Sequence, residues 1–123
     1  MHGHNYVAFF EAGVEELDSI GRVIDFSVLK ERLGGWVDEH WDHGFVYWDK
    51  DSEVMAALDV MNEHRRFAMP YNPTAENMAQ YLLQVVGPSV LLDTPVYLSS
   101  VRVWETENCY ADANLEKVGV TPG

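Results

Sequence analysis

The sequence of 123 residues has a single cysteine, Cys109, and only eight lysines and arginines against twenty acidic residues. One cysteine excludes a disulfide within the chain and is typical of a reducing compartment such as the cytoplasm. The formal net charge of −12 disfavours nucleic acids and anionic membranes as partners. No apolar run approaches the roughly 20 residues that a membrane span needs, and no signal-peptide pattern is visible. We therefore expect a cytoplasmic protein that binds neither nucleic acid nor membranes.

Hydrophobic residues make up 47% of the chain and include four tryptophans, which predicts a folded globule. At this length, and without repeats or low-complexity tracts, residues 1–123 should form a single domain. Residues 4–16 have the aromatic and β-branched composition of a strand that ends at Gly13. Apolar residues lie on both faces of this strand, so we expect both faces to be covered.

Two helices and a second strand are expected further along the chain. Residues 21–43 predict a short strand end and then a helix, which Gly34-Gly35 could kink or break. Residues 69–88 predict the clearest helix, with Asn72 as its cap, Pro73 as its first residue and Gly87-Pro88 as its end. Residues 94–111 alternate as a strand with a hairpin partner. This order indicates an α+β domain with two helices on one face of an antiparallel sheet.

Three groups of residues could carry chemistry. Asp42 next to His43 is the arrangement that fixes an imidazole tautomer for proton transfer, although such dipeptides also occur by chance. His2 and His4 would share one face of an extended segment and could meet on a metal ion. Two ligands are fewer than the three or four of a zinc site. The only adjacent basic pair, Arg65-Arg66, is best interpreted as a solvated loop.

Glu105 allows two interpretations. On a strand it would share a face with Val101 and Val103, while Arg102 and Trp104 point the other way. Burying a carboxylate next to an apolar row is costly without partners, so Glu105 could simply lie at the solvent-facing end of the strand. It could instead anchor a ligand, because a carboxylate accepts two parallel N–H bonds from a guanidine-like edge such as that of a pterin or guanine.

Five motifs, in order, resemble the 6-pyruvoyltetrahydropterin synthase / 6-carboxytetrahydropterin synthase family. The resemblance runs from residue 2 to about residue 111 and rests on HGHNY (2–6), GRVIDFSVLK (21–30), WDHGFV (41–46), NPTAENMAQYL (72–82) and VRVWET (101–106). It implies a tunnelling fold, an antiparallel sheet with two helices on one face. It also implies homo-oligomers, with trimers stacked into hexamers and active sites between subunits.

The resemblance also implies a zinc site and a catalytic pair. The family holds zinc with three histidines, of which His2 and His4 match two. Its catalytic Asp-His pair matches Asp42 and His43. Zinc would polarise the side-chain oxygens of the substrate while acid and base groups move protons.

Two further positions are implied to bind the substrate, 7,8-dihydroneopterin triphosphate. Glu105 matches the glutamate that anchors the pterin, and Thr74 matches a threonine near it. The bacterial carboxytetrahydropterin type, which serves queuosine (7-deazaguanine) biosynthesis, is the favoured activity. A pyruvoyl-forming or side-chain-cleaving enzyme of the same fold is an alternative, and so is a non-catalytic pterin-binding homologue.

The chain departs from the family at its N-terminus. The third zinc histidine and the catalytic cysteine of the family lie upstream of HGHNY, as does its first strand, whereas this chain begins at Met1. Val46-Tyr47 also replaces the usual leucine-asparagine. We expect that Met1 is an internal methionine, that the domain is N-terminally truncated relative to the family, and that the 123-residue chain binds zinc poorly and turns over little.

Overall fold

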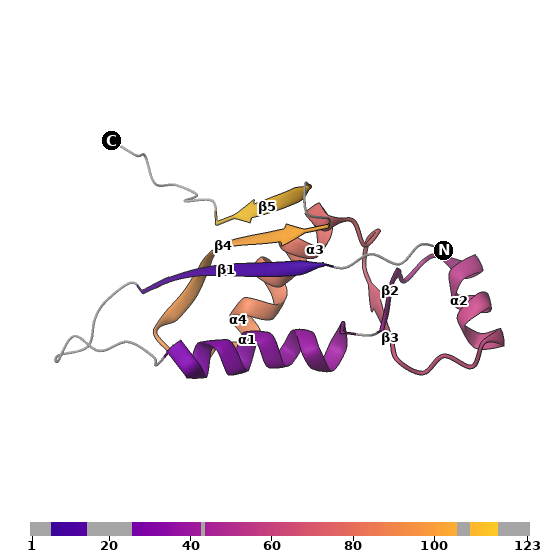
Figure 1. Ribbon diagram of the computed structural model, residues 1–123, viewed down its shortest axis with the longest axis horizontal. Coiled ribbons are helices and arrows are strands. Elements are labelled where there is room, and N and C mark those ends of the chain that lie inside the picture. The colour runs from indigo at the N-terminus through magenta and orange to yellow at the C-terminus, as the bar shows by residue number, and fades with distance from the viewer. Residues whose placement is uncertain (1–5, 15–25, 43, 106–108, 116–123) are drawn as a thin grey trace.

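The computed structural model describes residues 6–14, 26–42, 44–105 and 109–115. Its elements follow one another from indigo to yellow in Figure 1. They are β1 (Val7–Val14), α1 (Phe26–His40), β2 (Phe45–Trp48), α2 (Ser52–Val60), β3 (Arg66–Met69), α3 (Ala75–Tyr81), the π-helical turn η1 (Leu82–Val86), α4 (Gly87–Val90), β4 (Val96–Trp104) and β5 (Tyr110–Asn114).

An antiparallel sheet in the order β1-β4-β5 forms the centre of the fold. The register places Phe9 opposite Arg102, and Arg102 opposite Asp112. An irregularity between Glu11 and Ala12 shifts the pairing of β1 with β4. The strand expected over residues 94–111 is therefore two strands, β4 and β5, and β4 pairs with β1 on its other side.

The helical segments α1, α3, η1 and α4 cover one face of this sheet, whereas α2 lies away from it beside β2 and β3 (Figure 1). Strand alternation turns every second residue of β4 toward the helices, where apolar side chains of α1, α3, η1 and α4 meet them. The buried core consists of Leu33, Trp41, Met69, Ala75, Met78, Ala79, Leu82, Leu83, Val86, Leu91, Val96, Leu98, Val101, Val103 and Ala113. The expected α+β arrangement is confirmed. In the described part of the chain, no helix is long and apolar enough to cross a membrane.

The helix expected over residues 69–88 begins later and ends later than its sequence signals suggested. Thr74 caps α3, since its side chain accepts a bond from the Asn77 N–H at 3.1 Å. Asn72 is not the cap; its carbonyl accepts from the Asn77 side chain at 2.8 Å. The predicted cap was two residues too early because both residues have capping side chains.

Gly87-Pro88 does not end the helix, which continues through α4 to Val90. Proline has no N–H, and its ring would collide with the carbonyl four residues earlier. The chain accommodates it by widening into η1, where the Gly87 N–H bonds to the Leu82 carbonyl five residues back. Gly34-Gly35 likewise fails to interrupt α1, which runs unbroken over fifteen residues.

The β2–α2–β3 unit was absent from the expected order. β2 and β3 form a separate two-stranded parallel sheet, with Phe45 opposite Arg66. Asp51 caps the connecting helix α2 by accepting from the Val54 N–H at 3.1 Å. Each strand has only four residues, which is too short for a clear alternation.

Candidate functional site

Three of the six predicted site residues are described by the structure. His2, His4 and His43 lie outside the described residues. Asp42 follows α1, Thr74 precedes α3, and Glu105 follows β4. Figure 1 shows that α1 and β4 end, and β1 begins, at the same end of the main sheet, next to β2 and β3.

The position of Asp42 is set by the last turn of α1. The N–H groups of both Trp41 and Asp42 donate to the Val37 carbonyl, at 2.8 and 2.9 Å. The Asp42 carbonyl accepts a bond from Arg65 Nε at 2.6 Å, and the residue is exposed. Asp42 is therefore held through its backbone, at an exposed position after α1.

The basic pair is exposed and Arg65 lies in the loop before β3, as predicted, but both side chains have partners. Arg65 donates to the carbonyls of Asp42 and Asp38, at the C-terminal end of α1. Arg66 is the first residue of β3 and forms an ion pair with Asp59 at 2.8 Å. The capping contacts join residues more than twenty positions apart, so no local pattern could show them.

Glu105 lies directly after β4, where its N–H bonds to the Cys109 carbonyl at 2.9 Å. The sequence correctly placed Val101 and Val103 on the buried face and Arg102 and Trp104 on the other. Glu105 itself is half-buried at the end of the strand. Its backbone is therefore held by Cys109, the residue before β5.

Tyr6 is a neighbour of Glu105 that the sequence did not single out. Val7 pairs with Trp104, so Tyr6 and Glu105 are the next residues at the same end of the two strands. Burial raises the pKa of the Tyr6 hydroxyl, and the negative charge of Glu105 raises it further. The hydroxyl therefore stays protonated over the physiological range and can donate a hydrogen bond.

Thr74 has an observed structural role. Its hydroxyl accepts from the Asn77 N–H, and its carbonyl accepts from the Met78 N–H at 2.8 Å. The residue is exposed. These bonds place the Thr74 side chain at the positive end of α3, although its predicted role near the pterin stays a prediction.

Aromatic rings connect the end of α1 to β3 and α3, close behind Asp42. His40 stacks on Trp36 with ring centroids 4.6 Å apart, as expected for a partly buried helical residue. The cluster consists of Trp36, His40, Trp41, Phe67, Tyr71 and Tyr81. Burial raises the pKa of both tyrosine hydroxyls, with a smaller contribution of Tyr81 to the shift at Tyr71. The helical spacing of Trp36 and His40 was the only sequence signal for this cluster.

Among the described residues, no group of three or more His, Cys, Asp or Glu side chains could hold a metal ion. The two histidines that the resemblance assigns to zinc are outside this part of the chain. A zinc site therefore stays a prediction.

These features define an α+β protein with the tunnelling fold. A solved structure titled as an uncharacterized protein from Wolinella succinogenes superimposes with a TM-score of 0.77 over 94% of this chain and 79% of that chain. The two sequences are 21% identical, so the likeness supports the fold alone.

The family follows from the sequence comparisons. The family model described as 6-pyruvoyl tetrahydropterin synthase matches residues 1–116. The 6-carboxy-5,6,7,8-tetrahydropterin synthase of Rickettsia typhi is 30% identical over 112 residues, which are 91% of this chain and 81% of that protein. The protein of the same name from Haemophilus influenzae is 28% identical over 91% of this chain and 80% of its own length. The chain belongs to the 6-pyruvoyl tetrahydropterin synthase family, as the ordered motifs predicted.

Proposed function

We propose that the chain is a zinc-dependent pterin synthase that acts on 7,8-dihydroneopterin triphosphate, as a 6-carboxy-5,6,7,8-tetrahydropterin synthase in queuosine biosynthesis. The observation that carries the proposal is the match to relatives of that name at about 30% identity along most of both chains. The structure supports it because α1, which Asp42 follows, and β4, which Glu105 follows, end at the same end of the sheet (Figure 1).

Glu105 would bind the pterin ring. A carboxylate can accept two parallel N–H bonds from the amino-pyrimidine edge of a pterin, and such charge-assisted pairs are strong and directional. The half-buried position strengthens these bonds relative to open water. Glutamine would replace one acceptor by a donor, so Glu105→Gln should weaken pterin binding.

Asp42 and His43 would move protons on the side chain of the substrate. Asp42 would orient the imidazole of His43, which would act as general base and acid while triphosphate leaves. His2 and His4 would hold zinc, which when bound supplies polarisation of the side-chain oxygens.

The proposed partners are the pterin substrate and further copies of this chain. In trimers stacked into hexamers, other copies of the chain would cover the outer face of the main sheet, the face away from α1, α3 and α4. We propose no binding to nucleic acid or membranes, given the charge of −12, and a cytoplasmic location.

The test is a product assay on 7,8-dihydroneopterin triphosphate with three variants. Glu105→Gln should raise the Kd for the pterin about 10- to 100-fold, which corresponds to the free energy of one hydrogen bond to a charged group. In a form of the enzyme that turns over this substrate, His43→Ala should lower kcat about 10²- to 10⁴-fold with little change in binding. His64→Ala, an exposed histidine between α2 and β3, is the matched control and should change neither.

The nature of the product separates the alternatives. A 6-carboxy product supports the proposal, whereas a pyruvoyl product or a cleaved side chain identifies another enzyme of the family. Pterin binding without turnover would identify a non-catalytic homologue. Full activity of the His43→Ala variant would remove the Asp-His pair from the mechanism.

A further inference from the structure

Arg65 contacts both sides of the turn that carries Asp42. Its side chain donates from Nε to the Asp42 carbonyl at 2.6 Å and from Nη2 to the Asp38 carbonyl. Its own carbonyl accepts from the Phe45 N–H at 3.0 Å. One residue therefore binds the chain before and after position 43.

The side-chain bonds satisfy groups that α1 cannot satisfy itself. The last carbonyls of a helix have no partners within it. Here the Asp42 N–H bonds to Val37 rather than to Asp38, so the Asp38 carbonyl depends on another donor. The guanidinium is a rigid fork that can reach two carbonyls at once, which a lysine ammonium on a flexible stem does less well.

The backbone of Arg65 is itself fixed. Its N–H donates to the Glu63 carboxylate at 2.9 Å. Gly44 lies so close that a Cβ added there would be 3.1 Å from the Arg65 carbonyl oxygen and 3.3 Å from its Cγ. A side chain at Gly44 would therefore push the Arg65 backbone away from the chain at residues 44 and 45. This explains why a glycine follows the Asp-His pair.

We propose that Arg65 is a positioning residue, which holds the turn at Asp42 in the geometry that the Asp42–His43 pair needs for proton transfer. The inference rests on the proposed function and adds a residue that touches neither substrate nor metal. It acts through the backbone, and small displacements of a reacting group can cost about 10²-fold in rate.

The test compares Arg65→Ala and Arg65→Lys with the matched control Arg66→Ala, which removes the neighbouring exposed arginine and its pair with Asp59. Arg65→Ala should lower kcat about 10- to 100-fold and leave KM within about twofold. Arg65→Lys should recover part of kcat. Arg65→Ala changes the geometry of the Asp42–His43 pair, so the shape of its kcat–pH profile should also change. The profile of Arg66→Ala should keep the wild-type shape.

Amide hydrogen exchange gives a second readout that needs no turnover. In Arg65→Ala, exchange at Asp42 and Phe45 should accelerate at least about tenfold, while the Val101 and Val103 amides of β4 stay protected. Gly44→Ala should have the same local effect, since it displaces the Arg65 carbonyl.

The outcomes separate this inference from the proposed function. Unchanged exchange at Asp42 and Phe45 in Arg65→Ala would overturn the inference, and so would faster exchange with an unchanged kcat. An equal loss of kcat in Arg66→Ala would also overturn it. If the wild-type protein neither binds the pterin nor turns it over, the proposed function fails instead, and the exchange rates still decide whether Arg65 holds the turn.

Discussion

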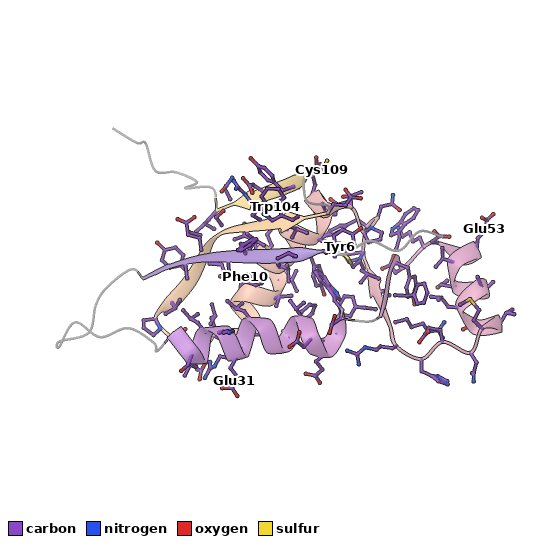
Figure 2. The ribbon with its side chains drawn as sticks, in the orientation of Figure 1. Tyr6, Phe10, Glu31, Glu53, Trp104 and Cys109 are labelled. Carbon is purple, nitrogen blue, oxygen red and sulfur yellow. The ribbon has the colours of Figure 1, made fainter. Side chains whose placement is uncertain are left out.

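The two faces of the main sheet differ in how far their side chains are buried. On the inner face Val101 is fully buried, whereas on the outer face Phe9, which lies next to β4 on β1, is 58% exposed. The helices of the chain itself complete the inner face. No described element covers the outer face, which presents Val7, Phe9, Tyr97, Trp104 and Tyr110. Trp104 is labelled in Figure 2. The first face stabilises the domain, and the second leaves apolar side chains exposed, the feature that the proposed assembly would cover.

The outer face also carries an organised ion pair. Arg102 binds Asp112 through two bonds, from Nε at 2.7 Å and from Nη2 at 3.0 Å. Its guanidinium lies 3.9 Å from the centre of the Tyr110 ring, and that ring contacts Trp104. Exposed pairs add little to stability, so this arrangement is better suited to fixing the shape of the surface.

The largest effect should come from the inner face. Leu98→Ala removes a buried side chain next to the helices and should lower the free energy of unfolding by about 2–5 kcal/mol. Tyr97→Ala, one residue earlier and on the outer face, is the control and should cost less than about 1 kcal/mol. Urea unfolding at one fixed protein concentration measures both. Equal losses would mean that the outer face is as well packed as the inner face.

The next effect concerns the contact of α4 with the same leucine. A Cβ at Gly87 would lie 2.6 Å from Leu98 Cδ1, which is too close. Gly87→Ala should therefore cost about 1–3 kcal/mol by overpacking, against a gain of about 1 kcal/mol in helix propensity. In the Leu98→Ala background both contacts with Leu98 are gone and the nearest is the Leu82 carbonyl oxygen at 3.3 Å, so the same change should cost much less. A loss that persists in that background would show that the strain lies elsewhere.

How far the sequence predicted these features depends on the length and regularity of each pattern. The alternation of β4 and the helical spacing of α1 repeat several times, and both were predicted. The β2–α2–β3 unit was missed because its strands have four residues each. Local signals also predicted that the helical segment ends at Gly87-Pro88. It continues to Val90, because the π-helical turn η1 accommodates Pro88.

In the candidate site, too, some residues were predicted from the sequence, whereas contacts between distant residues were not. Asp42, Thr74 and Glu105 were identified from motifs, through the resemblance to a family. The exposed loop position of Arg65 was predicted, but its partners were not, because its bonds to Asp38 and Asp42 span 27 and 23 positions. Contacts of that kind follow from the fold and cannot be derived from local spacing.

A third prediction tests whether the outer face is an interface. Phe9→Ser should weaken self-association by at least about tenfold, since it removes exposed apolar area worth more than about 1.4 kcal/mol per contact. The stability of the dissociated chain should change little. Leu92→Ser, an 85% exposed residue after α4, is the control and should leave association unchanged. Sedimentation over a range of concentrations measures the effect, and a wild-type monomer at all of them would contradict the proposed assembly.

The smallest effect should be the pH dependence of the ion pair on the outer face. The hydrogen bonds from Arg102 hold the pKa of the Asp112 carboxyl below its ordinary value of 3.8. A carboxyl with a lowered pKa in the folded state stabilises that state above its unfolded pKa, and the contribution disappears as the pH falls through the folded pKa. Asp112→Asn should therefore lower the urea midpoint slightly at about pH 7, and the difference from the wild type should vanish at about pH 2. The side chain is exposed, so added salt should shrink the difference at neutral pH. A difference that survives both acid and salt would show that Asp112 acts through packing against its neighbours, and the outer face would then resemble the inner one more closely.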